Sequence, residues 1–182
     1  MVLAAGGGRR FDGSGQGLKL LAPFRGRPLV SWAVQAAVDS AIGPTWVVSG
    51  ALDLSGSLPA GARLITNTGW ADGQATSLQT AVRTAREEGL GAIVVGLADQ
   101  PLIPASAWRA IATSDAPIAV ATYDGIRRNP VRLSAAVWDL LPSAGDEGAR
   151  SVFRHRPELV QEVPCEGDPV DIDTREDLRK WS

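Results

Sequence analysis

Short apolar runs rich in β-branched residues alternate with segments of helical periodicity along the chain. Such runs, about four to eight residues long and bounded by turn-forming residues, are typical of buried strands. Between them, apolar residues recur every three or four positions over residues 29–37 and 78–85, which predicts amphipathic helices. The predicted strands lie at residues 1–5, 45–48, 62–66, 92–97, 118–122, 130–133 and 159–163.

The central run Ile93, Val94 and Val95 is continuously apolar rather than alternating. A strand with this pattern is covered on both faces, so the succession of strands and helices predicts a mostly parallel sheet between helical layers. We therefore expect an α/β protein with a three-layer αβα, Rossmann-like fold. In such sheets, ligands bind beyond the carboxyl ends of the strands.

The chain has 182 residues, no internal repeat and no block of like charges. The stretches at residues 54–61 and 141–148 are rich in glycine, proline and serine, but they are short enough to be loops. We therefore expect residues 1–182 to form a single domain. Only five residues precede the first glycines, so the first strand is expected to be short.

Composition excludes several kinds of site. Cys165 is the only cysteine and His155 the only histidine, which excludes a disulfide framework, a cysteine-based zinc site and a multi-histidine metal site. The net charge of -2 argues against a nucleic-acid partner, because proteins that bind phosphate backbones carry basic stripes. No apolar run approaches the roughly 20 residues of a membrane span. We expect a cytoplasmic protein with no membrane partner.

The first strand leads into three glycines and two arginines, which is a candidate phosphate-binding loop. Consecutive glycines allow backbone N–H groups to converge on an anion, and a guanidinium such as that of Arg10 can hold phosphate oxygens in a bidentate fork. The dinucleotide motif G-x-G-x-x-G is broken, because Phe11 stands at its third glycine. A flexible turn is the alternative interpretation of these residues.

Lys19 is a second candidate for binding phosphate. The chain otherwise uses arginine for positive charge, with Lys180 as its one other lysine. A compact ammonium on a flexible stem can follow a triphosphate, whereas the alternative is an ordinary surface lysine.

Three acidic residues are candidate metal ligands. Asp99 follows the buried strand 92–97, at the edge where ligands bind, and a hard cation such as Mg²⁺ prefers carboxylate oxygens. In an extended segment, Asp171 and Asp173 project to the same side. Simpler roles are also open: Asp99 could cap the helix expected near Pro104, and the acids near Asp173 could belong to a helix start.

That helix start is indicated by Thr174 and Asp177, which fit the capping pattern [ST]-x-x-[DE]. Another loop, residues 67–77, carries amide and hydroxyl groups that could contact a base or ribose, although a turn followed by an N-cap explains it equally well. Arg127, Arg128 and Asn129 could face an acidic substrate, or they could be exposed and inert. The lone His155 is expected on a polar helix face.

Taken together, these segments resemble the MobA-like nucleotidyltransferases over nearly the whole chain. Within that family the chain is most similar to the molybdenum cofactor cytidylyltransferases, because the CTP-using branch begins Leu-Ala-Ala-Gly, as this chain does at Leu3 to Gly6. The resemblance rests on residues 3–10, Lys19, residues 26–29, Gly73, Ser77, Leu78, residues 98–101 and residues 171–174. Departures are Asp12 in place of a glycine, a longer spacer at residues 13–17, and Arg128-Asn129-Pro130 in place of Gly-His-Pro.

The resemblance implies a Mg²⁺-dependent nucleotidyltransferase. It would transfer CMP from CTP to a phosphorylated small-molecule acceptor, a molybdopterin-type cofactor, with release of pyrophosphate, and it could contact a molybdoenzyme or its maturation factor. The implied catalytic residues are Arg10, Lys19 and Asp99, and the implied metal ligands are Asp99 and Asp173. The implied nucleotide-binding residues are Leu3, Ala4, Ala5, Gly6, Gly8, Arg10, Lys19, Asn67, Gly73 and Ser77, and the acceptor side is assigned to Arg128, Asn129 and Asp171.

A phosphate acceptor would account for the scarcity of histidine and cysteine. A phosphate monoester has a second pKa of about 6, so it is largely anionic at neutral pH and needs no base to activate it. The alternatives are guanylyl transfer, a sugar-phosphate or phospholactate acceptor, and a non-catalytic nucleotide-binding protein of cofactor maturation. A Rossmann dehydrogenase is less favoured, because Phe11 breaks the glycine motif and no acid directly follows Val48.

Overall fold

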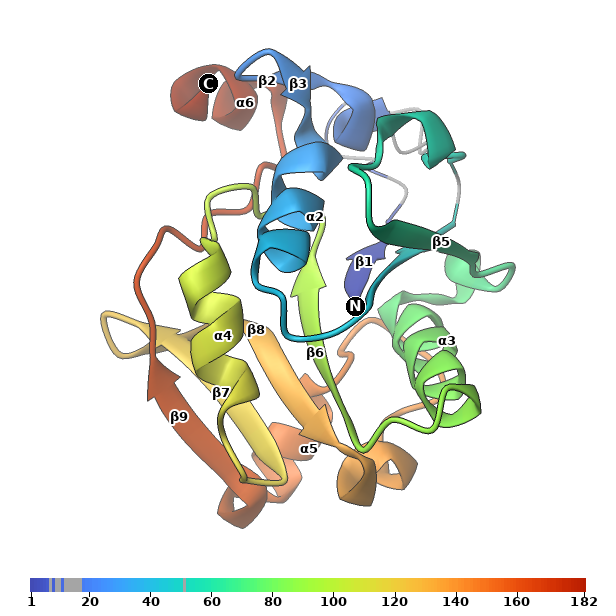
Figure 1. The fold of residues 1–182 in the computed structure, drawn as a ribbon, viewed down its shortest axis with the longest axis vertical. Helices are drawn as coiled ribbons and strands as arrows, with labels where there is room; N and C mark the ends of the chain where they lie inside the picture. The colour runs from blue at the N-terminus through green and yellow to red at the C-terminus, as the bar shows by residue number, and fades with distance from the viewer. Residues whose placement is uncertain (7, 9–10, 12–17, 51) are drawn as a thin grey trace.

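The computed structural model describes residues 1–6, 8, 11, 18–50 and 52–182. In this part of the chain, seven strands form one sheet in the order β5-β4-β1-β6-β8-β7-β9, with helices packed on both faces (Figure 1). A short hairpin of β2 (Pro23–Phe24) and β3 (Arg27–Pro28) stands apart from it. The strands of the sheet are β1 (Val2–Ala4), β4 (Thr45–Ser49), β5 (Ala62–Thr66), β6 (Ala92–Leu97), β7 (Ile118–Tyr123), β8 (Ile126–Ser134) and β9 (Val160–Pro164).

Most of the helices lie between consecutive strands, and α6 follows the last strand. The α-helices are α2 (Leu29–Asp39), α3 (Gln74–Glu87), α4 (Ala105–Ala112), α5 (Arg150–His155) and α6 (Arg175–Trp181). Short 3-10 helices are η1 (Leu18–Leu21), η2 (Ser55–Ser57), η3 (Trp70–Asp72), η4 (Ala135–Leu140) and η5 (Pro157–Leu159). The two helices predicted from periodicity are α2 and α3. None of the helices in the described residues is long and apolar enough to span a membrane.

All seven predicted strands are present, and the sheet is mostly parallel as expected. β1 pairs in parallel with β4 and β6, β4 with β5, and β7 with β9. The exception is β8, which runs antiparallel to both β6 and β7. It does so because Asp124 and Gly125, with φ of 50° and 77°, make a two-residue turn of the kind that joins hairpin strands.

β8 begins at Ile126, earlier than predicted, and it carries an irregularity at Asn129 and Pro130. Val131 pairs with Val120, but the next paired residue is Arg128, opposite Ala121. Proline cannot donate to a ladder, so the two residues between them bulge out of the pairing. The bulge lies at the carboxyl end of β6, where the acceptor-side residues were expected.

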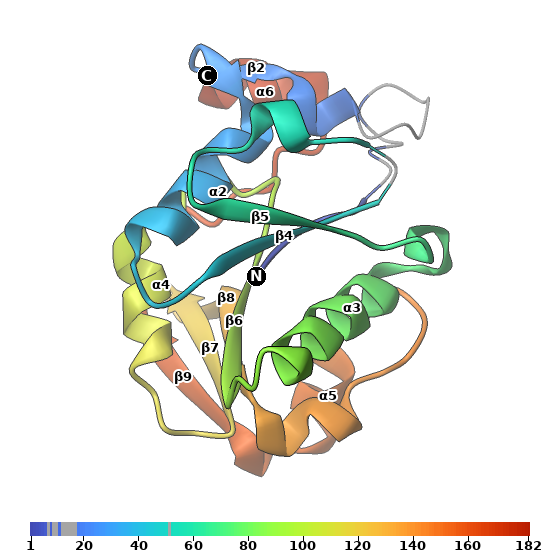
Figure 2. The ribbon, with the colours of Figure 1, turned by 45° about the vertical axis from the view of Figure 1, so that its right-hand side comes forward.

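Apolar clusters pack on both faces of the sheet, which confirms the three-layer prediction (Figure 2). Ile93 and Val95 belong to the cluster beneath α3 and α5, whereas Val94 packs against the cluster beneath α2 and α4. The continuous apolar run of β6 therefore packs against apolar side chains on both faces of the sheet.

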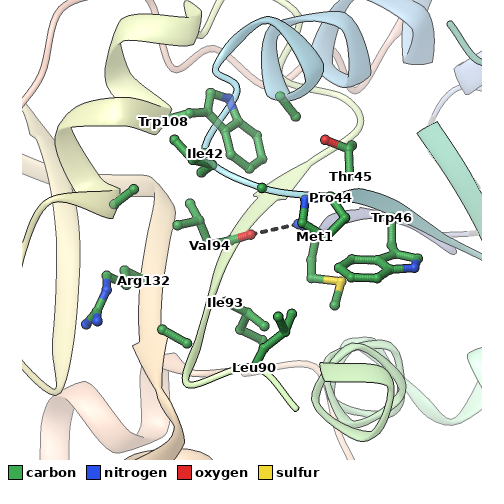
Figure 3. Close-up of a pocket in the computed structure, with 14 residues that line it drawn as sticks. Met1, Ile42, Pro44, Thr45, Trp46, Leu90, Ile93, Val94, Trp108 and Arg132 are labelled. Atoms are coloured by element: carbon green, nitrogen blue, oxygen red, sulfur yellow. Dashed lines mark hydrogen bonds between the residues drawn. The ribbon is translucent and has the colours of Figure 1, made fainter. Parts of the chain in front are cut away.

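A cavity of about 220 Å³ lies at the amino ends of β1, β4 and β6 (Figure 3). Met1, Trp46 and Trp108 are among its lining residues. None of the residues predicted to bind ligands lines it, so it is separate from the predicted site.

Gly96 brings α4 close to the sheet, and its replacement tests this packing. A Cβ at Gly96 would lie 2.5 Å from the ring of Trp108, a side chain that is 3% exposed. We expect Gly96→Ala to lower the free energy of unfolding by about 1–3 kcal/mol, because overpacking forces the neighbours to shift. Gly91→Ala is the control, since nothing lies within 4 Å of a Cβ there. Equal effects of the two substitutions in urea denaturation would contradict the packing described.

Candidate active site

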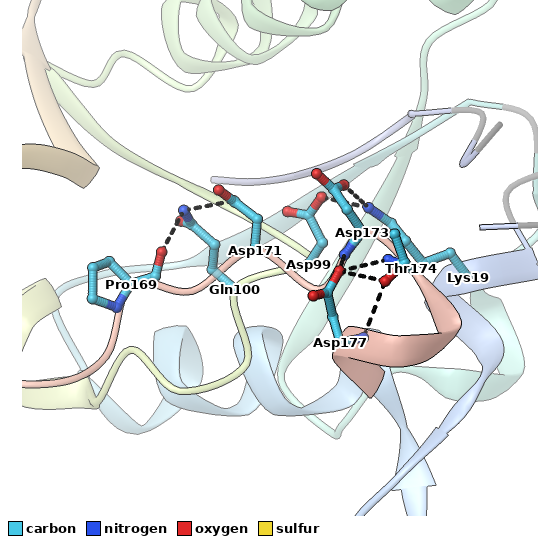
Figure 4. A network of polar contacts seen from close by, with 8 residues as sticks. All are labelled: Lys19, Asp99, Gln100, Pro169, Asp171, Asp173, Thr174 and Asp177. Atoms are coloured by element: carbon cyan, nitrogen blue, oxygen red, sulfur yellow. Dashed lines mark hydrogen bonds and ion pairs between the residues drawn. The ribbon is translucent and has the colours of Figure 1, made fainter. Parts of the chain in front are cut away.

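A buried lysine holds two carboxylates together at the carboxyl edge of the sheet (Figure 4). The Nζ of Lys19, in η1, donates to Oδ2 of Asp99 at 2.7 Å and to Oδ1 of Asp173 at 3.0 Å. The Lys19 side chain is 9% exposed, and the two aspartates are 23% and 27% exposed. Three of the predicted site residues, from distant parts of the chain, thus share one contact.

The chain reaches this arrangement through backbone pairing beyond the end of β6. The N–H of Ala98 donates to the carbonyl of Leu3, and the N–H of Ile172 donates to the carbonyl of Asp99, both at 3.0 Å. Ile172 is fully buried and packs with Phe24 and Leu29. Ile172 therefore anchors the segment that carries Asp171 and Asp173 beside Asp99.

Asp173 is also fixed by the helix start that follows it. Thr174 caps α6: its Oγ1 accepts from the N–H of Asp177 at 3.0 Å, and Oδ2 of Asp177 accepts from the N–H of Thr174 at 2.8 Å. The same Oδ2 accepts from the N–H of Asp173 at 3.2 Å. The predicted capping box is confirmed, and it lies next to the lysine contact rather than replacing it.

The alternative role for Asp99, capping the helix near Pro104, is wrong. α4 begins at Ala105 with Pro104 at its N-cap and no side-chain cap, while the carboxylate of Asp99 is turned to Lys19.

Asp171 lies on the other side of Asp99 and is held by a glutamine. Nε2 of Gln100 donates to Oδ1 of Asp171 at 2.9 Å and to the carbonyl of Pro169 at 3.4 Å (Figure 4). Asp171 is an exposed residue as a whole, but its carboxyl group is partly removed from water. This desolvation raises the pKa of the carboxyl, and the charge of the nearby Asp99 carboxylate raises it further. Asp171 therefore releases its proton less readily than an isolated aspartate.

Burial and charge act in opposite directions on Lys19. Desolvation is the largest single influence and lowers its pKa, but the charges and hydrogen bonds of Asp99 and Asp173 together outweigh it, so the pKa is raised. The lysine stays cationic, which is what a site for polyphosphate requires.

The donor set fits a divalent cation of the Mg²⁺ type. Oxygens of Asp99 and Asp173 converge on one cationic atom, and Mg²⁺ is commonly bound by one or two carboxylates with water and substrate phosphate completing the shell. No group of three or more His, Cys, Asp or Glu side chains arranged to hold a metal is found in the described residues. The chain would therefore supply two carboxylates and leave the other positions to the substrate.

The glycine loop is described in part. Leu3 and Ala4 are buried in β1, Ala5 follows them, and Gly6 is exposed with nothing within 4 Å of a Cβ. Gly8 has a φ of 62°, a conformation that favours glycine. Arg10 lies outside the described residues. Gly6 thus leaves open space just beyond β1, where the phosphate-binding turn is predicted.

Asn67 and Ser77 are brought together, but they hydrogen-bond to each other. Nδ2 of Asn67 donates to Oγ of Ser77 at 3.0 Å and to Oγ1 of Thr76 at 2.9 Å, and its Oδ1 accepts from the N–H of Gly69. Both Asn67 and Ser77 are less than 6% exposed. These groups therefore brace the turn into α3, and their role in nucleotide binding stays a prediction.

Gly73 is required by a contact between two loops. Its φ is 106°, and a Cβ there would lie 2.6 Å from the carbonyl oxygen of Gly145. That carbonyl accepts from the N–H of Ala75 at 2.9 Å, and Oδ1 of Asp146 accepts from the N–H of Gln74 at 3.3 Å. The loop at residues 145–146 thus caps α3. Sequence reasoning missed this contact, because the two segments are some 70 residues apart.

A cavity of about 560 Å³ opens beside the contact of Lys19 with Asp99 and Asp173. The residues predicted for the acceptor side line this cavity. Its wall includes Asp171, Arg128 and Asn129, together with Leu3 and Gln100. Sequence reasoning missed the α5 residues that also line it, Arg150 and Phe153, because that short helix shows no clear apolar periodicity. His155, at the end of the same helix, is exposed as expected.

Comparison with known proteins gives consistent matches. A relative called nicotine blue oxidoreductase, from Paenarthrobacter nicotinovorans, is 29% identical over 194 residues, covering 98% of this chain and 93% of the relative. The crystal structure of an Rv0371c homologue from Mycobacterium sp. strain JC1 superimposes with a TM-score of 0.81 at 28% identity, covering 98% of this chain and 91% of that one.

The manganese complex of Rv0371c from Mycobacterium tuberculosis H37Rv has the same fold, with a TM-score of 0.78 at 23% identity and coverage of 99% and 94%. Residues 1–162 match the MobA-like NTP transferase domain. The family match covers the sheet up to Glu162 in β9, together with Lys19 and Asp99, and it ends before Asp171 and Asp173. The chain therefore belongs to the MobA-like NTP transferase family, and with it to the nucleotidyltransferases.

Proposed function

We propose that the protein is a Mg²⁺-dependent cytidylyltransferase that transfers CMP from CTP to a phosphorylated acceptor of the molybdopterin type and releases pyrophosphate. The observation that carries the proposal is the contact of Lys19 with Asp99 and Asp173 at the carboxyl edge of the sheet. A cation and two hard-oxygen ligands there suit a triphosphate and its metal ion. In this setting the protein would act in the cytoplasm and could contact a molybdoenzyme or its maturation factor.

In the proposed reaction, an oxygen of the acceptor phosphate attacks the α-phosphorus of CTP. The new P–O bond forms as the bond to the β-phosphate breaks, and the electron pair leaves with pyrophosphate. Because the acceptor phosphate is already anionic at neutral pH, the chain needs no general base. Its task is to position the two phosphates and to neutralise their charge.

Each part of the site has a role in that task. Lys19, and Arg10 in the glycine loop, would neutralise the triphosphate, while the backbone of Gly6 and Gly8 would approach its oxygens. A divalent cation held by Asp99 and Asp173 would add Lewis-acid stabilisation of the triphosphate. The manganese complex of a protein with the same fold supports this metal class.

The identity of the nucleotide rests on the start of the loop. Leu3, Ala4, Ala5 and Gly6 form the Leu-Ala-Ala-Gly start of the CTP-using branch, which supports CTP over GTP. Guanylyl transfer and a sugar-phosphate or phospholactate acceptor are the variants that stay closest to this chemistry.

The relative that is called an oxidoreductase favours a second candidate function, a redox reaction. A protein 29% identical over 98% of this chain is called nicotine blue oxidoreductase, so the same scaffold could serve a redox reaction. Consumption of NADH or NADPH without pyrophosphate release would favour this candidate over the proposed transfer.

Replacement of Asp99 tests the proposed chemistry. With CTP, Mg²⁺ and molybdopterin, we expect Asp99→Asn to lower pyrophosphate release on the order of 100-fold, because a central charged group of the site is lost. Asp139→Asn is the matched control, since that carboxylate is 87% exposed and pairs with Arg86 outside the site. Unchanged release by Asp99→Asn would remove the proposed metal site, and no release by the wild type with any acceptor would favour a binding protein.

A thermal-shift comparison of the four NTPs tests the nucleotide assignment without an acceptor. At about 100 times its Kd, a ligand stabilises the folded state by about 2.7 kcal/mol, which corresponds to roughly 5–10 °C for a chain of this size. We expect that shift with CTP and Mg²⁺, and a smaller one when EDTA replaces the metal. Protection by GTP in the absence of protection by CTP would overturn the cytidylyl assignment.

A further inference from the structure

The charges of the lysine contact are too few to balance a triphosphate. Lys19 carries one positive charge, and Asp99 and Asp173 carry two negative charges. A divalent cation would leave this group with a single positive charge, whereas one phosphate monoester alone carries about -1.5 to -2 at neutral pH. Cations beyond Lys19 are therefore needed at this edge of the sheet.

Arg175 follows Asp173 by two residues, and its side chain reaches the glycine loop. Two residues of chain span at most about 7 Å. The Cζ of Arg175 lies 5.7 Å from the centre of the Phe11 ring, within the range of a cation–π contact. The N–H of Phe11 donates to the carbonyl of Gly8 at 2.9 Å. Arg175 therefore connects the segment of Asp173 with the loop predicted to bind phosphate.

The backbone of Arg175 is fixed, because α6 is held at both ends. The capping box of Thr174 and Asp177 forms the start of the helix. At the other end, Nε and Nη2 of Arg25 donate to the carbonyl of Trp181 at 3.1 and 2.9 Å. Arg25 belongs to the turn of the β2–β3 hairpin, beside which α6 lies (Figure 1). The helix thus presents Arg175 at a fixed place beside the glycine loop.

The guanidinium of Arg175 has no acid partner among the described residues. The residue is exposed, and it forms no ion pair with Glu176 or Asp177, the two acids that follow it. The ring of Phe11 orients the guanidinium but offers it no acceptor oxygen. Its N–H groups therefore stay available, and a planar fork of donors suits phosphate oxygens.

The location of Arg175 relative to Asp171 places it on the side of the leaving group. Asp171 lines the cavity of about 560 Å³, where the acceptor is predicted, and neither Arg175 nor Phe11 lines that cavity. In phosphoryl transfer, the attacking and leaving oxygens lie roughly in line, on opposite sides of the phosphorus. A cation on the side away from the acceptor cavity therefore faces the phosphates that leave.

We propose that Arg175 is a further triphosphate-binding residue, which donates to the phosphates that leave as pyrophosphate, and that the ring of Phe11 positions its guanidinium. The charge of Lys19 also holds two carboxylates, whereas the charge of Arg175 is left for the substrate. The role of Arg175 in the transfer rests on the proposed function, but its contact with a polyphosphate requires neither a nucleotide nor turnover.

Inorganic tripolyphosphate tests this contact without a nucleotide. Calorimetric titration with the Mg²⁺ complex of tripolyphosphate, at about 0.15 M salt to screen distant charges, would compare the wild type with Arg175→Gln. We expect the variant to bind about tenfold more weakly, because a charged hydrogen bond is lost. Arg179→Gln is the matched control, since it removes the same charge from an exposed arginine one turn further along α6. It should bind like the wild type.

A nucleotide pair locates the contact along the substrate. The nucleoside triphosphate that protects best in the thermal-shift comparison would be titrated beside its own monophosphate. Arg175→Gln should weaken binding of the triphosphate about tenfold and leave the monophosphate unchanged, because the monophosphate lacks the two phosphates that leave. Equal losses for both nucleotides would contradict the assignment to the leaving group.

A double-mutant cycle tests whether Phe11 acts through Arg175. Phe11→Leu should weaken tripolyphosphate binding about threefold in the wild type and have no effect in Arg175→Gln, because the ring then has no guanidinium to position. The same loss in both backgrounds would mean that Phe11 supports only the loop, and it would remove the positioning role. Circular dichroism checks that each variant is folded.

Equal binding of tripolyphosphate by Arg175→Gln and by Arg179→Gln would overturn the proposal, and so would a wild type that does not bind the probe. The pyrophosphate assay is a separate test, because these titrations involve no turnover. Polyphosphate binding that depends on Arg175, in a protein that transfers no nucleotide, would contradict the proposed function and leave this binding role standing.

Discussion

The site depends on one buried charge, the ammonium of Lys19, which stays inside the protein because Asp99 and Asp173 compensate it. A buried cation without partners is costly, and removal of one member of such a group typically destabilises a protein by about 3–5 kcal/mol. The contact also joins three separate parts of the chain: η1, the end of β6 and the segment before α6. The interaction that assembles the candidate site is therefore the one that closes this edge of the fold.

The carboxylates are positioned by more than the lysine. Ile172 fixes the segment between Asp171 and Asp173 in the core, and the capping box of α6 holds the backbone of Asp173. Gln100 holds Asp171 on the other side. Groups that are fixed before the substrate arrives need little reorganisation during the reaction, which is the condition under which electrostatic stabilisation is most effective. The cavity of about 560 Å³ opens next to this edge, between the sheet and α5.

Local patterns were sufficient to predict the strands, the layers and the capping box, because each depends on residues close in the sequence. The antiparallel direction of β8 was missed, although the Asp124-Gly125 pair is a recognised hairpin signal. The location of Asp99 beyond a buried strand indicated a ligand site, but its contact with Lys19 spans 80 positions, and no local pattern contains it.

The polar loop before α3 shows what local patterns leave out. Asn67 and Ser77 hydrogen-bond to each other across ten positions, and only the three-dimensional arrangement reveals this contact. Their role in nucleotide binding stays a prediction. Arg10, which lies outside the described residues, stays a prediction.

The measurement that tests the account most directly is a crystal structure with CTP and Mn²⁺, in which anomalous scattering locates the metal. The account predicts a manganese peak within bonding distance of Asp99 and Asp173, with Lys19 turned to the triphosphate. A bound nucleotide with no metal at these carboxylates, and Lys19 still bridging them, would contradict it.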